Sequence, residues 1–291
     1  MSIVNARDLL FKATRERYAV GAFNVTSLVQ MEAVVEAHLE RKAPVIIQTS
    51  VAPTKLLGIN VLVAIYHAIA GTAPIPICLH LDHCTDVAYC KKCADAGYTN
   101  IMIDASKLPF DGNIQATREV TDYCHTAGNI SVEGELGTVS GVEDQIRVVE
   151  SESELCNPDQ VLEFVERTGV DLLAPAIGTA HGVYKTADPR IDFERFQRIF
   201  EIVNGKSLRT PLVVHGGTGL PRPTVERLIS YGGAKVNVST ELKHSMIDAT
   251  YTYLTAHREE YDPGKVDQAV KNAIKKTVFN WIDWFGCTGK A

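Results

Sequence analysis

The chain has 291 residues, of which 45% are hydrophobic and 22% charged, a composition typical of a globular protein with a sizeable buried core. The formal net charge of −6 excludes the general basic footprint of a nucleic-acid-binding or membrane-surface protein. No apolar run approaches the ~20 residues of a membrane-spanning helix, and the amphipathic amino terminus lacks the apolar core of a signal peptide. The seven cysteines are irregularly spaced, so we expect reduced thiols and a cytoplasmic protein.

Short apolar runs alternate with longer helical patterns along almost the whole chain. The runs are continuous rather than alternating, which is typical of strands that are covered on both faces. Eight runs predict strands, at residues 19–25, 44–50, 76–83, 100–106, 130–137, 172–178, 211–217 and 235–240. Helical patterns lie between them, at residues 27–42, 61–70, 87–96, 114–127, 158–168, 193–203 and 223–231.

Eight strand–helix units in one chain predict an α/β fold, a (β/α)8 TIM barrel that forms a single domain over residues 1–291. A doubly wound sheet is the alternative, but residues 21–24 do not supply the glycine-rich dinucleotide turn that it would need after the first strand. Two further helices are predicted after the eighth strand, at residues 241–259 and 265–285. The second forms a C-terminal helical extension of about residues 262–286, which we expect to cover a barrel end or to dock against another subunit.

Three of the apolar runs end in a histidine, namely His83, His181 and His215. Because the carboxyl ends of barrel strands meet at one mouth, we expect these imidazoles to converge. A lone histidine is more often a structural group, but three at equivalent positions suit a catalytic Zn²⁺ site with an open position. His80 lies three residues before His83 within the same strand, so we expect it to face the opposite side and leave it out of this set.

Acidic residues accompany these histidines. Asp82 adjoins a predicted ligand and is the candidate for proton transfer beside the metal. Asp104 lies near the end of the fourth strand, where it could support a ligand or bind a second cation. Glu133 and Glu135 lie two residues apart on one strand and share a face, and inward carboxylates are costly unless they are paired or bound to a cation. For each of them a hydrogen-bonded structural carboxylate is the alternative.

Residues 138–157 show no periodic pattern but carry many polar and acidic side chains. A loop of about 20 residues in a compact barrel is often an active-site lid. Glu143 and Asp144 lie on it. A solvated charged loop is the alternative.

Glycines follow two of the histidines, at Gly182 and Gly216. Glycine lets backbone N–H groups approach an anion. The loops after the seventh and eighth barrel strands are also a frequent phosphate site. Ser239 and Thr240, which lead into the next helix, add hydroxyl donors there.

Together these stretches resemble the class II, metal-dependent ketose-bisphosphate aldolases, the fructose- and tagatose-bisphosphate aldolase family. The resemblance covers essentially the whole chain in order. The matching stretches are residues 22–24, 79–83, 102–106, 132–137, 178–184, 214–219 and 235–241.

The resemblance implies one Zn²⁺ ion on the three histidines. It places Glu135 where some members have an alternate ligand, and Asp104 and Glu133 are further candidates for an alternate or second metal site. It also implies that Asp82 transfers the proton of the aldehyde-derived hydroxyl, and that Glu143 transfers the proton at the carbon of the dihydroxyacetone phosphate unit. The implied substrate- and phosphate-binding residues are Asn24, Ser50, Gly182, Lys185, Gly216, Thr218, Asn237, Ser239 and Thr240. A monovalent cation (Na⁺ or K⁺) is expected nearby, and a homodimer or homotetramer is expected by analogy.

The implied reaction is reversible cleavage of a ketose phosphate between C3 and C4 to dihydroxyacetone phosphate and an aldehyde, with fructose or tagatose bisphosphate as the expected substrate. Two residues depart from the family pattern. Gly264 stands where many members have an arginine that holds the distal phosphate in a neighbouring subunit's site, and Val142 replaces a lid carboxylate or amide. A ketose 1-phosphate without the distal phosphate is therefore the alternative substrate.

Two other enzyme classes stay open. A Schiff-base aldolase would use a lysine at a strand's carboxyl end, whereas Lys235 is expected to begin its strand, and Lys107 and Lys185 lie past strands or in loops. A zinc-dependent barrel hydrolase, in which the metal activates water, would usually have a tighter His-x-His pair, and the sequence contains none. A non-catalytic binding protein with a relic site is a third reading, which the presence of Asp82 beside the histidines disfavours.

Overall fold

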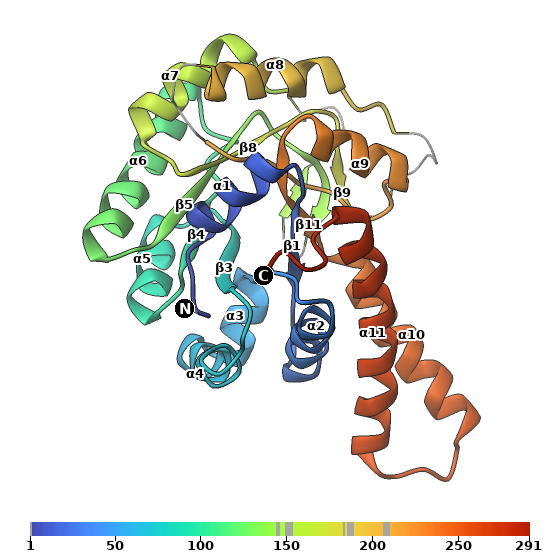
Figure 1. Ribbon diagram of the computed structural model, residues 1–291. Helices are drawn as coiled ribbons and strands as arrows, with labels where there is room; N and C mark the ends of the chain where they lie inside the picture. The colour runs from blue at the N-terminus through green and yellow to red at the C-terminus, as the bar shows by residue number, and fades with distance from the viewer. Residues whose placement is uncertain (1, 144–145, 149–153, 183, 185–188, 206–209) are drawn as a thin grey trace.

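The computed structural model describes residues 2–143, 146–148, 154–182, 184, 189–205 and 210–291, with the backbone alone for 142–143 and 146–148. Within these ranges eight parallel strands close into a barrel in the order β1-β11-β10-β8-β5-β4-β3-β2 (Figure 1). The predicted (β/α)8 barrel is thus confirmed. The barrel strands are β1 (Val20–Asn24), β2 (Val45–Ser50), β3 (Ile77–Cys84), β4 (Asn100–Ile103), β5 (Ser131–Leu136), β8 (Leu172–Pro175), β10 (Leu212–Val214) and β11 (Gly233–Val238).

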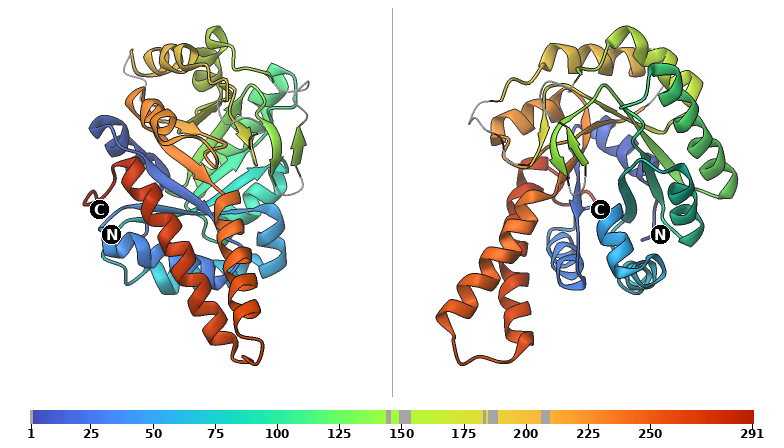
Figure 2. Two further views of the ribbon diagram at one scale, coloured as in Figure 1. Left: turned by 90° about the vertical axis from the view of Figure 1, so that its right-hand side faces the viewer. Right: turned by 180° about the vertical axis from the view of Figure 1, so that it is seen from behind.

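Helices surround the barrel, as the three views of Figures 1 and 2 show. Gly97 and Gly169 end two of them in the left-handed conformation, with φ of 115° and 68°, which glycine adopts without a Cβ penalty. The helices are α1 (Ala6–Glu16), α2 (Leu28–Arg41), α3 (Val51–Leu57), α4 (Ile59–Ala70), α5 (Val87–Ala96), α6 (Phe110–Ala127), α7 (Pro158–Thr168), α8 (Phe193–Asn204), α9 (Arg222–Ser230), α10 (Thr240–Ala256) and α11 (Pro263–Phe285).

Three strands end three residues earlier than the sequence pattern predicts. β4 ends at Ile103, β8 at Pro175 and β10 at Val214. The residues that follow have left the ladder, and Gly178 and Gly216 take positive φ values of 94° and 68°. The polar groups expected at strand ends are therefore carried by the loops that begin there.

The sequence patterns do not predict α1, α3, or the regular structure in residues 138–157. There β6 (Ser140–Glu143) and β7 (Ile146–Val148) form an antiparallel hairpin, and β6 pairs with β9 (Ala180–His181). The prediction of an irregular loop is wrong for this hairpin. Strands of three and four residues are too short to show a period, and the partner of β6 lies about 40 residues further along the chain.

The chain ends in a helical hairpin that projects from the barrel. Figures 1 and 2 show α10 and α11 side by side, with α11 running back along α2. The carboxyl half of α11 buries Val278, Trp281, Ile282 and Phe285. This helix occupies the position predicted for the C-terminal extension.

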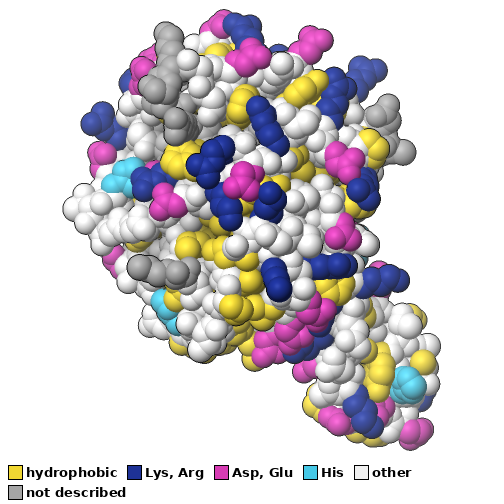
Figure 3. All heavy atoms as spheres, in the orientation of Figure 1, with side chains coloured by type: hydrophobic (Ala, Val, Ile, Leu, Met, Phe, Trp, Pro, Cys, Tyr) yellow, Lys and Arg dark blue, Asp and Glu magenta, His cyan; other side chains and the backbone are white. Residues whose placement is uncertain are grey.

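Charged side chains of both signs lie on the surface. On the face drawn in Figure 3, Asp and Glu side chains lie among the Lys and Arg side chains. In the described ranges no single helix is long and apolar enough to cross a membrane. The helices α3 and α4 taken together are long and apolar enough, but they are bent by 91° relative to each other.

A buried histidine on α2 makes a testable contribution to stability. His38 is fully buried, its ring lies 5.3 Å from that of Phe23, and its Nδ1 lies 2.7 Å from the carbonyl oxygen of Val34. Burial lowers the pKa of His38 to about 4, whereas the unfolded chain has the ordinary pKa of about 6.5. Between these values the unfolded state binds the extra proton, so stability that is present above pH 6.5 is lost as the pH falls towards 4.

We expect this residue alone to lower the free energy of unfolding by about 2 kcal/mol between pH 7 and pH 5. Urea unfolding of the wild type and of His38→Leu at both pH values measures the effect. The variant should lose less stability over this range by that amount, and an equal loss in the two proteins would contradict the prediction.

Candidate functional site

Three histidines from different strands meet at the barrel mouth. His83 lies in β3, His181 in β9 just beyond β8, and His215 directly after β10. The ring centre of His83 lies 4.6 Å from that of His181 and 4.5 Å from that of His215. One ring nitrogen from each of the three lies within 4.8 Å of the others. Three imidazoles at this spacing are a donor set suited to a zinc ion.

His83 reaches this cluster because its strand is irregular. The register between β3 and β4 shifts between Leu81 and Cys84, and His83 has a φ of 44°, a left-handed conformation that is strained for a non-glycine residue. The shift breaks the alternation of side chains. His80 lies inside the barrel, 3.8 Å from Asp82, and His83 is turned to the interior as well. The expectation that His80 and His83 face opposite sides is therefore wrong, although His80 is in neither metal-capable group of the described residues.

Carboxylates hold two of the histidines. The two ring nitrogens of His215 lie between Glu135 and Glu133, with Nδ1 2.9 Å from Glu135 Oε2 and Nε2 2.9 Å from Glu133 Oε1. Asp104 Oδ2 lies 3.0 Å from Nδ1 of His83. A carboxylate on the second nitrogen is the usual support of a metal-binding histidine. His83, Asp104 and Glu135 form the other group that could hold a cation.

The electrostatics of the cluster differ from one histidine to the next. Burial, followed by the charges of His83 and His215, lowers the pKa of His181 well below its usual value, so its imidazole is neutral. Burial and His83 also act to lower the pKa of His215, but its hydrogen bonds with Glu133 and Glu135 raise it. Metal ligation requires a neutral imidazole, so a cation at His215 has to displace a proton.

Asp82 is a fully buried carboxylate beside the histidines. Its Oδ2 accepts a hydrogen bond from Asn24 at 2.8 Å, and its Oδ1 accepts one from Asn237 at 3.2 Å. Burial acts to raise the pKa of Asp82, but the charges of His83 and Lys235 lower it overall. The group is therefore ionised and can accept a proton.

Two further residues of the site are not found by the sequence patterns. Gln48 donates a hydrogen bond of 2.6 Å to Asn24 Oδ1 and so orients the amide that holds Asp82. Because side chains alternate along a strand, Gln48 shares a face of β2 with Ser50, two residues later. This spacing could have identified Gln48 from the sequence. Lys235 does not begin its strand, since β11 begins at Gly233, and its side chain is fully buried in the barrel. Lys235 lies two residues before Asn237, so alternation along β11 predicts that both side chains point into the barrel.

Three buried polar atoms near the ends of β10 and β11 have no hydrogen-bond partner among the described residues. They are Thr218 Oγ1, Asn237 Oδ1 and Ser239 Oγ. Ser239 is the residue before α10, yet its side chain does not cap the helix. Unpaired buried polar atoms are rare in folded proteins, so these atoms indicate a position for a polar ligand.

Close backbone approaches shape the same region. A Cβ on Gly216 would lie 2.3 Å from the carbonyl oxygen of Ala180, so only glycine fits. Gly182 also has a positive φ, of 86°, and Thr240 is the first residue of α10.

Ser50 ends β2 in register with Asp82. Lys185 and Asp144 lie outside the described residues, and of Glu143 the structure describes only the backbone, in β6.

Comparisons with known proteins agree on one family. The family described as fructose-bisphosphate aldolase class-II matches residues 4–290. A candidate fructose-1,6-bisphosphate aldolase from Coccidioides immitis is 30% identical with a TM-score of 0.88, over 98% of this chain and 97% of that one. The YdjI aldolase from Escherichia coli K12 is 30% identical with a TM-score of 0.85, over 99% of both chains. A fructose-bisphosphate aldolase from Campylobacter jejuni, at 21% identity and a TM-score of 0.83 over 100% of this chain and 97% of that one, shares the fold.

Proposed function

The chain belongs to the class II fructose-bisphosphate aldolase family, and from this premise we propose that it is a metal-dependent lyase that reversibly cleaves a ketose phosphate between C3 and C4. The products are dihydroxyacetone phosphate and an aldehyde, and the candidate substrates are fructose and tagatose bisphosphate, with a ketose 1-phosphate as the alternative. The convergence of His83, His181 and His215 beside the buried carboxylate of Asp82 is the observation that carries the proposal.

The proposed metal is one Zn²⁺ ion on the three histidines, and the residues fit it. The donors are imidazoles, His181 is neutral because it is buried, and Asp104 supports the second nitrogen of His83. When bound, Zn²⁺ supplies a Lewis acid for the carbonyl and hydroxyl oxygens of the dihydroxyacetone phosphate unit. An alternate or second metal position at Glu135, Asp104 or Glu133 stays a prediction.

Asp82 is the proposed acid–base group. Its ionised carboxylate removes the proton of the C4 hydroxyl in the cleavage direction and returns it in condensation. The amides of Asn24 and Asn237 each hold one of its oxygens, which orients the carboxylate while leaving lone pairs for the substrate. Glu143, at the end of β6, is proposed from the family resemblance to transfer the proton at C3.

The phosphate of the dihydroxyacetone phosphate unit is proposed to bind at the ends of β9, β10 and β11. The unpaired hydroxyls of Thr218 and Ser239 support this position, and the amino end of α10 at Thr240 favours an anion. Gly182 and Gly216 allow close backbone approach. Lys185 and a monovalent cation nearby are part of the proposal on the family resemblance alone.

One feature favours a substrate without the distal phosphate. Gly264, at the start of α11, stands in place of the family's arginine, and Lys265 beside it pairs with Glu260 at 2.6 Å. Lysine also lacks the bidentate fork with which arginine holds a phosphate. We therefore propose that a ketose 1-phosphate is cleaved at least as well as the corresponding bisphosphate.

Retro-aldol assays on fructose 1-phosphate and fructose 1,6-bisphosphate, with and without a chelator, test both proposals. We expect activity that the chelator abolishes and a kcat/KM for the monophosphate no lower than for the bisphosphate. A strong preference for the bisphosphate would contradict the second proposal only. Activity that survives the chelator, together with borohydride trapping of substrate on the protein, would contradict the first.

The remaining expectations stay predictions. A homodimer or homotetramer is compatible with the exposed apolar side chains of Ile247, Tyr251 and Leu254 on α10. The cytoplasmic location rests on the cysteine composition alone. A Schiff-base role for Lys235 is disfavoured, because its ammonium is buried against Glu133 at 2.9 Å.

A further inference from the structure

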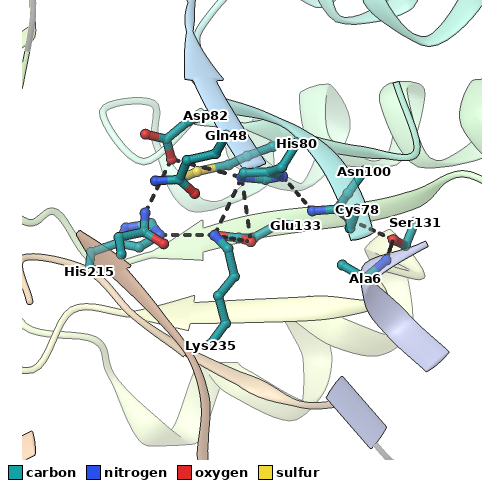
Figure 4. A network of polar contacts seen from close by, with 12 residues as sticks. Ala6, Gln48, Cys78, His80, Asp82, Asn100, Ser131, Glu133, His215 and Lys235 are labelled. Carbon is teal, nitrogen blue, oxygen red and sulfur yellow. Dashed lines mark hydrogen bonds and ion pairs between the residues drawn. The ribbon is translucent and has the colours of Figure 1, made fainter. Parts of the chain in front are cut away.

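A buried ion pair lies inside the barrel, in contact with His215. Figure 4 shows the side chain of Lys235, from β11, reaching the carboxylate of Glu133 on β5, with His215 and His80 beside the pair. We propose that Lys235 and Glu133 are positioning residues that set which nitrogen of His215 binds the metal. The inference rests on the proposed metal site, and it assigns a role to a lysine that the sequence analysis considered only as a Schiff-base candidate.

The contacts form a short chain that water does not reach. Lys235 Nζ lies 2.9 Å from Oε2 and 3.2 Å from Oε1 of Glu133, and Oε1 lies 2.9 Å from Nε2 of His215. The side chains of Lys235 and Glu133 have no exposed surface, and that of His215 has 1%. Each hydrogen bond is therefore made in the absence of competing solvent.

The chemistry of these groups determines which atom donates and which accepts each hydrogen bond. An ammonium only donates hydrogen bonds, and an ionised carboxylate only accepts them. Because Glu133 accepts from Lys235 on both oxygens, it is held as a carboxylate in one orientation, and Nε2 of His215 must carry its hydrogen towards it. The lone pair available to a cation is then on Nδ1, where Glu135 is the group to be displaced.

The lysine is held from its other side as well. Its Nζ lies 3.4 Å from Nε2 of His80, and Nδ1 of His80 contacts the side chain of Asn100. Asn100 accepts a hydrogen bond from Ser131, whose hydroxyl in turn accepts one from the backbone N–H of Ala6 at the start of α1. The ammonium thus has little freedom to move away from Glu133.

Stability alone does not explain this pair. Replacing a buried ion pair by apolar side chains of similar volume is often neutral or stabilising. A buried lysine near a metal site also carries an electrostatic cost, because its positive charge repels the cation. Positioning of His215 is a benefit that offsets both effects.

The charge of Lys235 and its positioning of Glu133 would change the Zn²⁺ affinity in opposite directions, so one substitution distinguishes the two roles. If the lysine acts only through its charge, Lys235→Met removes repulsion and tightens Zn²⁺ binding. If it positions Glu133 and His215, the same change weakens binding, by about 10- to 100-fold as for other residues that orient metal ligands.

The experiment measures the Zn²⁺ dissociation constant of the metal-depleted protein by competition with a chromophoric chelator, and the visible spectrum after Co²⁺ loading. Lys235→Met leaves Glu133 without its counterion, so Glu133→Met with Lys235→Met is a second variant that keeps the core neutral. We expect both to bind Zn²⁺ about 10- to 100-fold more weakly and to change the Co²⁺ spectrum. The matched control is Asp171→Asn, a buried carboxylate before β8 at the other end of the barrel, which should lower thermal stability and leave the metal affinity unchanged.

Unchanged or tighter Zn²⁺ binding in the folded double variant overturns the inference and leaves the proposed function intact. A wild-type protein that binds no Zn²⁺ overturns the proposed metal site, and the inference with it.

Discussion

Replacing Asp82 by alanine is expected to lower kcat for ketose phosphate cleavage by about 10²- to 10⁴-fold, which is the range for a general acid–base group. The variant loses the buried carboxylate that accepts the C4 hydroxyl proton, while His83, His181 and His215 are untouched. Steady-state kinetics together with the zinc content of the purified protein measure the two effects separately. We expect one Zn²⁺ per chain in the variant, as in the wild type.

Asp82→Asn is the control for changes in packing. It keeps the volume of the side chain but cannot take up the proton, so it should show the same loss of turnover. A variant of Asp82 that keeps its zinc and its turnover would show that the proton goes elsewhere.

Replacing His83 by alanine is expected to remove the bound metal and, with it, measurable turnover. This ring is central to the cluster, because it lies within 4.6 Å of both other histidine rings and contacts Asp104. Only two imidazoles then remain, and two are too few for a stable catalytic zinc site. Zinc analysis after dialysis, with activity measured before and after Zn²⁺ is added back, gives the result.

His67→Ala is the matched control, since this histidine is exposed on α4. It should keep both zinc and activity. Zinc retained at full stoichiometry in His83→Ala would exclude this residue as a ligand, and would contradict both groups of described residues that could hold a cation, because each includes His83.

Much of the architecture follows from local pattern. Continuous apolar runs separated by helical periods predict the closed barrel, because a parallel sheet with both faces covered requires such runs. The C-terminal extension follows from a second long helical period after the eighth strand. The short elements β6, β7 and α3 are not predicted by such patterns, because segments of three to seven residues show no measurable period.

For the site, the sequence by itself determined which residues to consider. His83, His181 and His215 stand where apolar runs end, Asp82 stands beside one of them, and Glu133 and Glu135 share a face by alternation. These signals are local, so they identify candidates without saying which side chains touch. Their roles as ligands and proton carriers stay predictions that the experiments above test.

Only the tertiary structure decided how these side chains are arranged. The register shift in β3 turns His83 into the barrel against the rule of alternation, and Glu133 and Glu135 lie on opposite nitrogens of a histidine 80 and more residues away. Lys235 is joined to Glu133 across 102 residues of chain. Such contacts depend on closure of the barrel, which brings distant strands together at distances of about 3 Å, and no pattern within one stretch of sequence encodes that geometry.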